Sequence, residues 1–289
     1  MNEKIALAVI GGSGLYDFPG LQDKWTIEVN TPFGKPSSQI LIGSLGQRRI
    51  AFLARHGIGH QISPTEVNYR SNIYALKLLG VQNIISVSAC GSLQEEFAPG
   101  DIVVPDQLFD NTNNRVRSFF ENGIVAHVGV GDPFCHRLNL DIFQALADSG
   151  AKKVHQGGKL LTIEGPRFST KAESNIYRSW GMSLIGMTAS PEAFLAREAE
   201  MCYSIMAHVT DYDVWHSIES PVSVDMVLQA LKNNTKVASE AIIRLIPKLN
   251  DEPDCSCASA LESAIITKKE FISEESIMNL DAIIGKYIH

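Results

Sequence analysis

The chain of 289 residues contains no apolar stretch that approaches the ~18 residues a membrane span needs. It also lacks any run of Lys or Arg that would form a basic stripe. Its 25 basic residues are outnumbered by 32 acidic ones, for a formal net charge of −7. We therefore expect neither a membrane nor a nucleic acid as a partner. A site for a small anion stays open, because such a site needs only a few donors.

The sequence also lacks the marks of a secretory leader. There is no cationic start and no cleavage site, and only six apolar residues, Ile5 to Ile10, precede Gly11 and Gly12. We expect a buried strand there and a cytoplasmic location. The composition, 45% apolar and 20% charged, is that of a globular protein, and the length suits one large α/β domain or two small ones.

Cysteine is sparse, with five residues at positions 90, 135, 202, 255 and 257. An odd, sparse set in a long chain indicates a reducing compartment. Cys255 and Cys257 are separated by a single serine. A zinc site would need a second ligand pair at matching spacing, and none is visible in the sequence. Two thiols in a linker, a redox pair and a stabilising disulfide all remain open.

Apolar runs alternate with helical patterns along the chain, which indicates α/β layering. We expect strands at 5–10, 38–45, 49–54, 83–87, 102–104, 159–163, 183–187 and 201–209. Helices are expected at 63–79, 139–150, 171–180, from 190 onward, at 223–249 and, as a pair, in the tail from 258 to 289. The first helix should begin at Ser63, because Ser63 and Glu66 can form a capping box and Pro64 suits the first helical position.

Five of the predicted strands end in a cluster of small or polar residues. The clusters are Gly12-Ser13-Gly14, Arg55-His56-Gly57, Ser88-Ala89-Cys90-Gly91, Met187-Thr188 and Thr210-Asp211-Tyr212-Asp213. In an α/β sheet, ligands bind outside the carboxyl ends of strands. Turn chemistry alone explains any one cluster, but five together predict one composite site.

Two of these clusters carry the groups that an anion site needs. Arg55 supplies a planar fork for an oxyanion, and the glycine turn around Ser13 offers backbone N–H groups and a hydroxyl. A basic surface loop and a tight strand-to-helix turn are the alternatives. His56 and His60 have no acidic or histidine partners at suitable spacing, so we expect no metal.

A third cluster suggests acid catalysis. Asp211 and Asp213 would point to the same side of an extended strand, so the pKa of one carboxyl should rise and leave it neutral. A solvated acidic turn is the alternative. Phe168, in Glu-Gly-Pro-Arg-Phe-Ser at 164–169, is suited to stack on a flat ring, although a core phenylalanine is also compatible with the pattern.

Seven motifs, specific in combination, extend this set over most of the chain. They are Ile-Gly-Gly-Ser-Gly-Leu at 10–15, Thr-Pro-Phe-Gly-Lys-Pro-Ser at 31–37, Ala-Arg-His-Gly at 54–57, Ala-Cys-Gly-Ser-Leu at 89–93, Thr-Ile-Glu-Gly-Pro-Arg-Phe-Ser at 162–169, Gly-Met-Thr at 186–188 and Thr-Asp-Tyr-Asp at 210–213. On these motifs the chain resembles the trimeric purine nucleoside phosphorylases over roughly residues 5–250. Within that family it is similar to the branch that acts on 5′-methylthioadenosine.

The resemblance implies a single three-layer α/β domain, with a central mixed β-sheet flanked by helices. We expect residues 1–250 to form this nucleoside phosphorylase domain and residues 251–289 to form a helical extension packed on it. The implied reaction is phosphorolysis of 5′-methylthioadenosine to adenine and 5-methylthioribose 1-phosphate. Inorganic phosphate is then a co-substrate, no metal or organic cofactor is needed, and the assembly is a homotrimer or a dimer of trimers.

The resemblance also implies a role for individual residues. At the phosphate it places Ser13, Arg55, His56, Ser88, Ala89 and Thr188. Around the nucleoside it places Phe168, Ser169, Asp211 and Asp213 at the base, Met187 under the ribose, and Val224, Val227 and Leu228 around the methylthio group. It further implies that His127 reaches into the site of a neighbouring subunit.

Asp211 is the expected neutral acid that protonates N7 of the leaving purine, with Asp213 as the second catalytic carboxyl. Asp211 also favours adenine, because the exocyclic amine needs an acceptor and relatives that use 6-oxopurines have Asn there. Two alternatives remain: a phosphorylase for 6-oxopurine nucleosides or methylthioinosine, and a nucleotide-binding or sensing module on the same fold.

Overall fold

Eleven strands form one mixed sheet in the computed structural model, which describes residues 4–216, 224–250 and 254–288. The side chains of Ser13, Leu15 and residues 224–234 are not described. The strands are β1 (Ile5–Gly11), β2 (Gln22–Ile27), β3 (Ile40–Leu45), β4 (Arg48–Ala54), β5 (Asn83–Ser92), β6 (Ile102–Val104), β7 (Gln107–Asn111), β8 (Val154–Gln156), β9 (Lys159–Ile163), β10 (Leu184–Gly186) and β11 (Cys202–Asp211).

The sheet has two branches, and β5 is the strand that they share. One edge of β5 pairs in parallel with β1 over Ile84–Ser86. Beyond the end of β1, the same edge pairs antiparallel with β10 at Gly91 and Ser92. The other edge pairs in parallel with β11 as far as Gly91. The order is β2-β3-β4-β1-β5-β10-β9-β7, with β11, β6 and β8 on a second branch. Because β4, β1, β5 and β11 are parallel neighbours, their carboxyl ends meet where the sheet divides.

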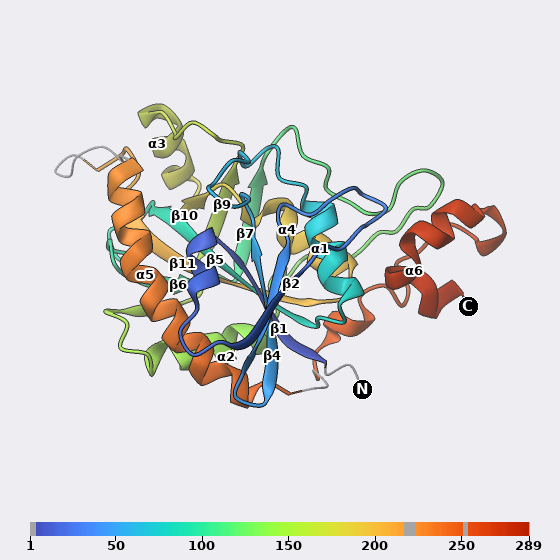
Figure 1. Ribbon diagram of the computed structural model, residues 1–289. Coiled ribbons are helices and arrows are strands. Elements are labelled where there is room, and N and C mark those ends of the chain that lie inside the picture. Colours follow the sequence, from blue (N-terminus) through green and yellow to red (C-terminus); the bar gives the residue numbers. More distant parts are fainter. Residues whose placement is uncertain (1–3, 217–223, 251–253, 289) are drawn as a thin grey trace.

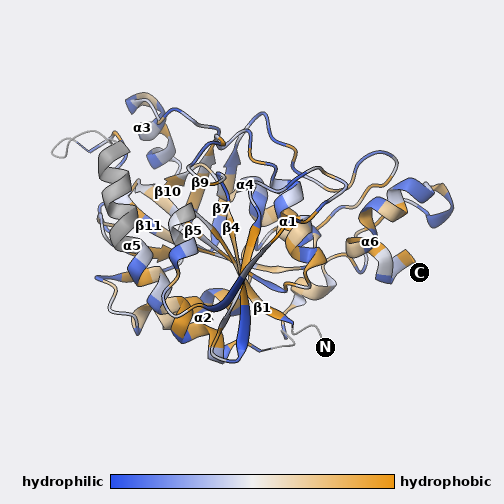
Figure 2. Ribbon diagram, in the orientation of Figure 1, coloured by the Kyte–Doolittle hydropathy of each residue, from blue (hydrophilic) through white to orange (hydrophobic). Residues whose placement is uncertain are grey.

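Helices cover both faces of the sheet (Figure 1). Alternate residues of β1 enter two separate cores, since Ala8 and Ile10 face one side and Leu7 and Val9 face the other. The first core includes α1 (Tyr69–Leu78), α4 (Ala189–Glu198) and α6 (Glu274–Ile288). The second includes α2 (His136–Ala147) and α5 (Val224–Leu245). Figure 2 shows the apolar residues gathered on the strands and on the helix faces that cover them. The predicted three-layer α/β fold is therefore confirmed.

A third, smaller core lies under α3 (Lys171–Ser179) on the β9–β10 branch. The sequence correctly predicted β1, β3, β4, β9 and the helices α2 to α5 to within a few residues. It did not anticipate β2, β7 and β8, because these strands carry few apolar residues at alternate positions. None of the described helices is long and apolar enough to cross a membrane.

The first helix begins later than predicted. Residues 63–67 form a turn in which the Glu66 carboxylate accepts the Ser63 N–H, so the capping-box contact exists without a helix behind it. The helix begins at Tyr69, where the side chain of Asn68 accepts the N–H of Ser71. Asn68 therefore takes the N-cap position that the sequence analysis gave to Ser63.

The C-terminal segment joins the core on the α1 side through residues such as Leu261, Leu280 and Ile284, and its helix α6 contacts α1. Only one α-helix, α6, is present where two were expected; it follows two short 3₁₀ turns, η3 (Ser256–Ser259) and η4 (Lys269–Phe271). The backbone of 264–266 is bonded to the loop at 125–127 instead, which leaves no partners for a helix. The domain boundary at residue 250 stays a prediction.

Candidate active site

Arg55 lies immediately beyond β4 and is only 2% exposed. Its Nε and Nη2 donate to the two carboxylate oxygens of Glu192, at 2.8 and 2.9 Å, and Glu192 is completely buried on α4. Burial acts to lower the pKa of Arg55, but the adjacent carboxylate more than offsets it and the pKa is raised. The fork predicted to hold phosphate is thus occupied by Glu192. Among the described residues, Nη1 has no hydrogen-bond partner, and it is the part of the guanidinium left for an anion.

A chain of hydroxyl groups leads from Arg55 to α4. Nη2 of Arg55 donates to Oγ of Ser86 at 2.7 Å, Ser86 and Ser88 are 3.1 Å apart, and Ser88 lies 3.4 Å from Oγ1 of Thr188. Ser86 and Ser88 belong to β5, and Thr188 is the N-cap residue of α4. The structure therefore brings together three of the predicted phosphate residues, with Ala89 next along β5.

The glycine turn after β1 lies at the same edge. The backbone N–H of Arg55 donates to the carbonyl of Gly11 at 2.9 Å, which joins the ends of β1 and β4. Ser13 begins a 3₁₀ turn, η1 (Ser13–Asp17), directly after Gly12. The backbone of Ser13 is placed where the sequence predicted, while its side chain lies outside the described atoms.

His56 is held as a neutral ring. Burial, together with the adjacent Arg55 charge, lowers the pKa of His56 to about 4. Its Nδ1 lies 2.9 Å from the carbonyl of Ile62, so the neutral ring donates from Nδ1 and Nε2 is left as an acceptor. An acceptor is suited to the P–OH group of a protonated phosphate. His56 stacks on His60 with ring centroids 4.4 Å apart.

The two aspartates at the end of β11 are brought together by a turn. Asp211 is the last residue of the strand, and Asp213 has a φ of +51°, so the extended backbone expected from the sequence is wrong at this point. The N–H of Asp213 donates to Oδ1 of Asp211 at 2.7 Å, and the Thr210 hydroxyl donates to Oδ2 at 2.6 Å. Both oxygens of Asp211 therefore accept hydrogen bonds from the protein.

Gly91 of β5 makes room for this pair. A Cβ at residue 91 would lie 2.9 Å from Oδ1 of Asp211 and 3.4 Å from Cβ of Asp213. Asp213 is 7% exposed, and its Oδ2 has no hydrogen-bond partner among the described residues. Burial raises the pKa of Asp213, against weaker stabilisation of its charge by the Ser174 hydroxyl and the Val214 N–H. The pKa of Asp213 is thus raised, and the main cause is its burial.

The loop at 164–169 carries an aromatic side chain and a hydroxyl group. Phe168 is 41% exposed, so the alternative of a core phenylalanine is wrong. The Ser169 hydroxyl is buried and has no partner among the described residues, which leaves it available to a polar ligand edge. Met187 packs with the small core under α3, and its sulfur would meet a Cβ at Gly165 at 2.7 Å.

Arg115 connects these loops, although the sequence gave no signal for it. Its Nη1 donates to the carbonyls of Met187 and Ser190, both at 2.7 Å, and its Nη2 donates to the carbonyl of Glu164 at 2.7 Å. Burial acts to raise the pKa of Glu164, but hydrogen bonds from Thr65, from two backbone N–H groups and from Arg115 lower it to about 2. Glu192 was also missed, because its Ser-Pro-Glu context predicts only a helix start.

Four predicted residues are not brought to this site by the described structure. Val224, Val227 and Leu228 occupy the first turns of α5, where side chains lie outside the described atoms. His127 is exposed on the loop that bonds to the C-terminal segment, where its N–H donates to the carbonyl of Ala264 at 2.9 Å.

Comparisons with known proteins agree with this geometry. Residues 6–247 match the model of the phosphorylase superfamily. The chain belongs to that superfamily. It is 53% identical to the S-methyl-5′-thioadenosine phosphorylase of Geobacter sulfurreducens, over 98% of this chain and 99% of that protein. It is 51% identical to the enzyme of the same name from Hyperthermus butylicus, over 91% and 96% of the two chains.

Solved structures of this superfamily superimpose closely on the chain. A methylthioadenosine phosphorylase from an antarctic soil metagenomic library matches with a TM-score of 0.93 and 43% identity, over 97% of this chain and 99% of the other. The methylthioadenosine phosphorylase of Schistosoma mansoni in complex with adenine matches with a TM-score of 0.82 and 36% identity, over 91% and 99%. The nucleoside phosphorylase fold predicted from the motifs is confirmed.

The Glu192→Gln variant should lose about 3–5 kcal/mol of unfolding free energy, because it leaves the buried Arg55 charge without a counter-charge. Glu240→Gln is the matched control: it breaks an exposed ion pair with Arg244 and should change stability by less than ~1 kcal/mol. Urea unfolding at one protein concentration measures both. Equal losses in the two variants would contradict the role assigned to the buried pair.

Proposed function

We propose that this protein catalyses phosphate-dependent cleavage of S-methyl-5′-thioadenosine to adenine and 5-methylthioribose 1-phosphate. The observation that carries this proposal is the placement of an anion-binding corner and an acid pair along one strand. Ser88 lies in the corner, and Gly91, three residues further along β5, pairs with Asp211. Three residues of strand span roughly 10 Å, which leaves room for a sugar between a phosphate and a base.

In the proposed reaction, a phosphate oxygen bonds to C1′ of the ribose as the C1′–N9 bond breaks. The electron pair of that bond moves to the purine, and a proton is delivered to N7. The sugar passes through an oxocarbenium-like state, as in other glycosyl transfers. Nη1 of Arg55, the hydroxyls of Ser88 and Thr188 and the N–H groups at the end of β1 hold the phosphate anion against this cation.

We assign the acid function to the aspartate pair. We propose Asp213 as the proton donor, in place of the Asp211 expected from the sequence, because burial raises the pKa of Asp213 and its Oδ2 has no hydrogen-bond partner among the described residues. The remaining carboxylate accepts the N–H of the exocyclic amine of adenine. A 6-oxopurine presents a carbonyl oxygen there. After the proton has moved to N7, both aspartates are carboxylates and neither can donate a hydrogen bond to that oxygen. The alternative of a 6-oxopurine nucleoside phosphorylase is therefore not favoured.

The chemistry requires no metal or organic cofactor, since phosphate is the nucleophile and an aspartic acid supplies the proton. We propose a homotrimer or a dimer of trimers, in which His127 completes the site of a neighbouring subunit. The loop that carries His127 also exposes Val125 and Val130, which suits burial in such a contact. A cytoplasmic location fits the free state of all five cysteines and a small-metabolite substrate.

Adenine release from S-methyl-5′-thioadenosine should depend on phosphate, and 5-methylthioribose 1-phosphate should appear in equal amount. Chromatography of the reaction with and without phosphate measures both products. Equal release without phosphate would make the protein a hydrolase, and binding without release would favour a sensing module. Inosine, tested in parallel, should react at least ~10⁴-fold more slowly, because the site is built for the amine edge.

The pH profile should report the raised pKa of Asp213. The acid is active while protonated, so kcat/KM should stay level at low pH and fall as pH rises through that pKa. Asp213→Asn should lower kcat by ~10²–10⁴-fold and remove this fall. Asp211→Asn, the matched control, should weaken the preference for adenine yet keep the fall. Retention of the fall in Asp213→Asn would contradict the assignment.

A further inference from the structure

Four of the five cysteines come together far from the proposed active site. Their Sγ atoms all lie within 4.8 Å of one another, although they come from three separate segments. Cys135 is the N-cap residue of α2, Cys202 begins β11, and Cys255 and Cys257 lie at the start of η3. The sequence analysis found no second ligand pair for Cys255 and Cys257. In the structure Cys135 and Cys202 form this second pair. They lie 67 residues apart in the chain, so a motif with short ligand spacing could not identify them.

The distances between these sulfurs fit a tetrahedral ion. Cys255 lies 3.2 Å from Cys202 and 3.7 Å from Cys135, sulfur to sulfur. Four thiolates around zinc, each at about 2.3 Å, have sulfurs roughly 3.8 Å apart. Cys135, Cys202 and Cys257 are buried and Cys255 is half-buried, so four protein ligands would close the coordination sphere. A closed sphere of four thiolates is typical of a structural zinc site.

Charged donors surround the sulfurs as a thiolate cluster requires. Nη2 of Arg137 donates to the sulfur of Cys202 at 3.5 Å, and Nη1 of Arg197 donates to that of Cys257 at 3.4 Å. Zinc with four thiolates carries a net charge of −2, which two guanidinium groups offset. Arg137 also contacts Asp141 and Asn83, while its buried Nε has no partner among the described residues. Cys135, at the start of a 12-residue helix, gains from the helix dipole as a thiolate.

We propose that Cys135, Cys202, Cys255 and Cys257 bind one zinc ion that holds the C-terminal segment to α2 and β11. Binding displaces the four thiol protons to solvent and leaves four Zn–S bonds, with no change in oxidation state. All-sulfur donors select zinc over magnesium, calcium and manganese. This site is independent of the proposed reaction, because Cys202 and Asp211 stand at opposite ends of β11, roughly 30 Å apart along the strand.

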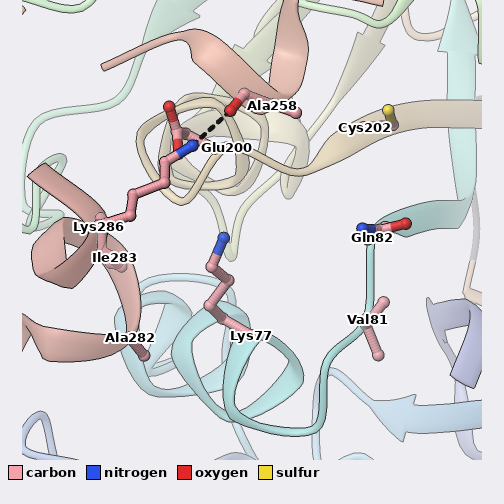
Figure 3. Close-up of a pocket in the computed structure, with 9 residues that line it drawn as sticks. All are labelled: Lys77, Val81, Gln82, Glu200, Cys202, Ala258, Ala282, Ile283 and Lys286. Atoms are coloured by element: carbon pink, nitrogen blue, oxygen red, sulfur yellow. Dashed lines mark hydrogen bonds and ion pairs between the residues drawn. The ribbon is translucent and has the colours of Figure 1, made fainter. Parts of the chain in front are cut away.

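A cavity of about 240 Å³ is lined by Cys202, one of the four cysteines of the cluster (Figure 3). It lies between α1, α6 and η3, and its lining includes Cys202 together with Lys77, Gln82, Ala258 and Lys286. Lys286 closes one side of it, where Nζ contacts the Glu200 carboxylate and donates to the carbonyl of Ala258. The cavity thus reaches the cluster at the Cys202 edge.

The zinc ion would fix the position of the start of the C-terminal segment. Residues 255–257 are the start of the described part of that segment, and residues 264–266 bond to the loop at 125–127. Cys255 and Cys257 would therefore anchor the chain ahead of the bridge between Ala126 and Ile265. Loss of the ion should loosen this segment before it affects the sheet.

Metal analysis of the full-length protein tests the proposal. The protein is produced with zinc in the medium and purified with a reductant and without chelators. Plasma mass spectrometry should find one zinc per chain, and Cys255→Ser/Cys257→Ser should lose it. Cys90→Ser is the matched control, because Cys90 is buried but lies outside the cluster, and it should keep the zinc. Zinc retained in the double variant, or absent from the parent protein, would overturn the proposal.

Two further measurements use the parent protein alone, and a third compares it with the double variant. Cobalt exchanged for zinc should show thiolate-to-cobalt charge transfer and the visible bands of tetrahedral cobalt; an octahedral spectrum would contradict four thiolate ligands. Thiol titration after unfolding with a chelator should find five free thiols per chain. Fewer than five would show a disulfide in place of the zinc site. A chelator should also lower the Tm of the parent protein and leave that of the double variant unchanged.

Discussion

The buried ion pair between Arg55 and Glu192 is the interaction on which the site depends. A guanidinium and a carboxylate removed from water carry a large desolvation cost, which only close geometry and further hydrogen bonds offset. Both are present: two N–H groups meet two oxygens, the Tyr203 hydroxyl donates to Oε1 at 2.7 Å, and Ser86 accepts from Nη2. The pair joins the end of β4 to α4 and fixes the orientation of the guanidinium.

The division of the sheet along β5 explains why the two halves of the chemistry meet. Along β5, Ser88 and its neighbour Thr188 lie just after the stretch that pairs with β1. The acid pair lies three residues further on, against Gly91, where β5 pairs with β10. Arg115 then connects the loops around the division through main-chain carbonyls. In the proposed reaction the anion and the base would therefore contact strands that are neighbours in one sheet, which would preorganise the groups at both ends of the substrate.

The positions of the polar clusters could be predicted from the sequence, because buried strands have a clear apolar pattern and parallel strands end at one edge. Contacts between distant residues could not. The pairing of Glu192 with Arg55 joins residues 137 positions apart, and the four-cysteine cluster joins three segments. The local backbone prediction was wrong at two positions. Asp213 has a left-handed backbone where a strand was expected, and Ser63 forms a turn while Asn68 is the N-cap residue of the first helix.

In the proposed reaction, the geometry of the Arg55 guanidinium, and not its charge alone, binds the phosphate. Arg55→Lys tests it most directly, because the lysine keeps the charge but cannot contact both Glu192 oxygens and an anion. Steady-state kinetics should show at least a ~10-fold rise in the KM for phosphate, with a lower kcat and with adenine binding in the absence of phosphate little changed. An unchanged KM for phosphate and an unchanged kcat would contradict the account.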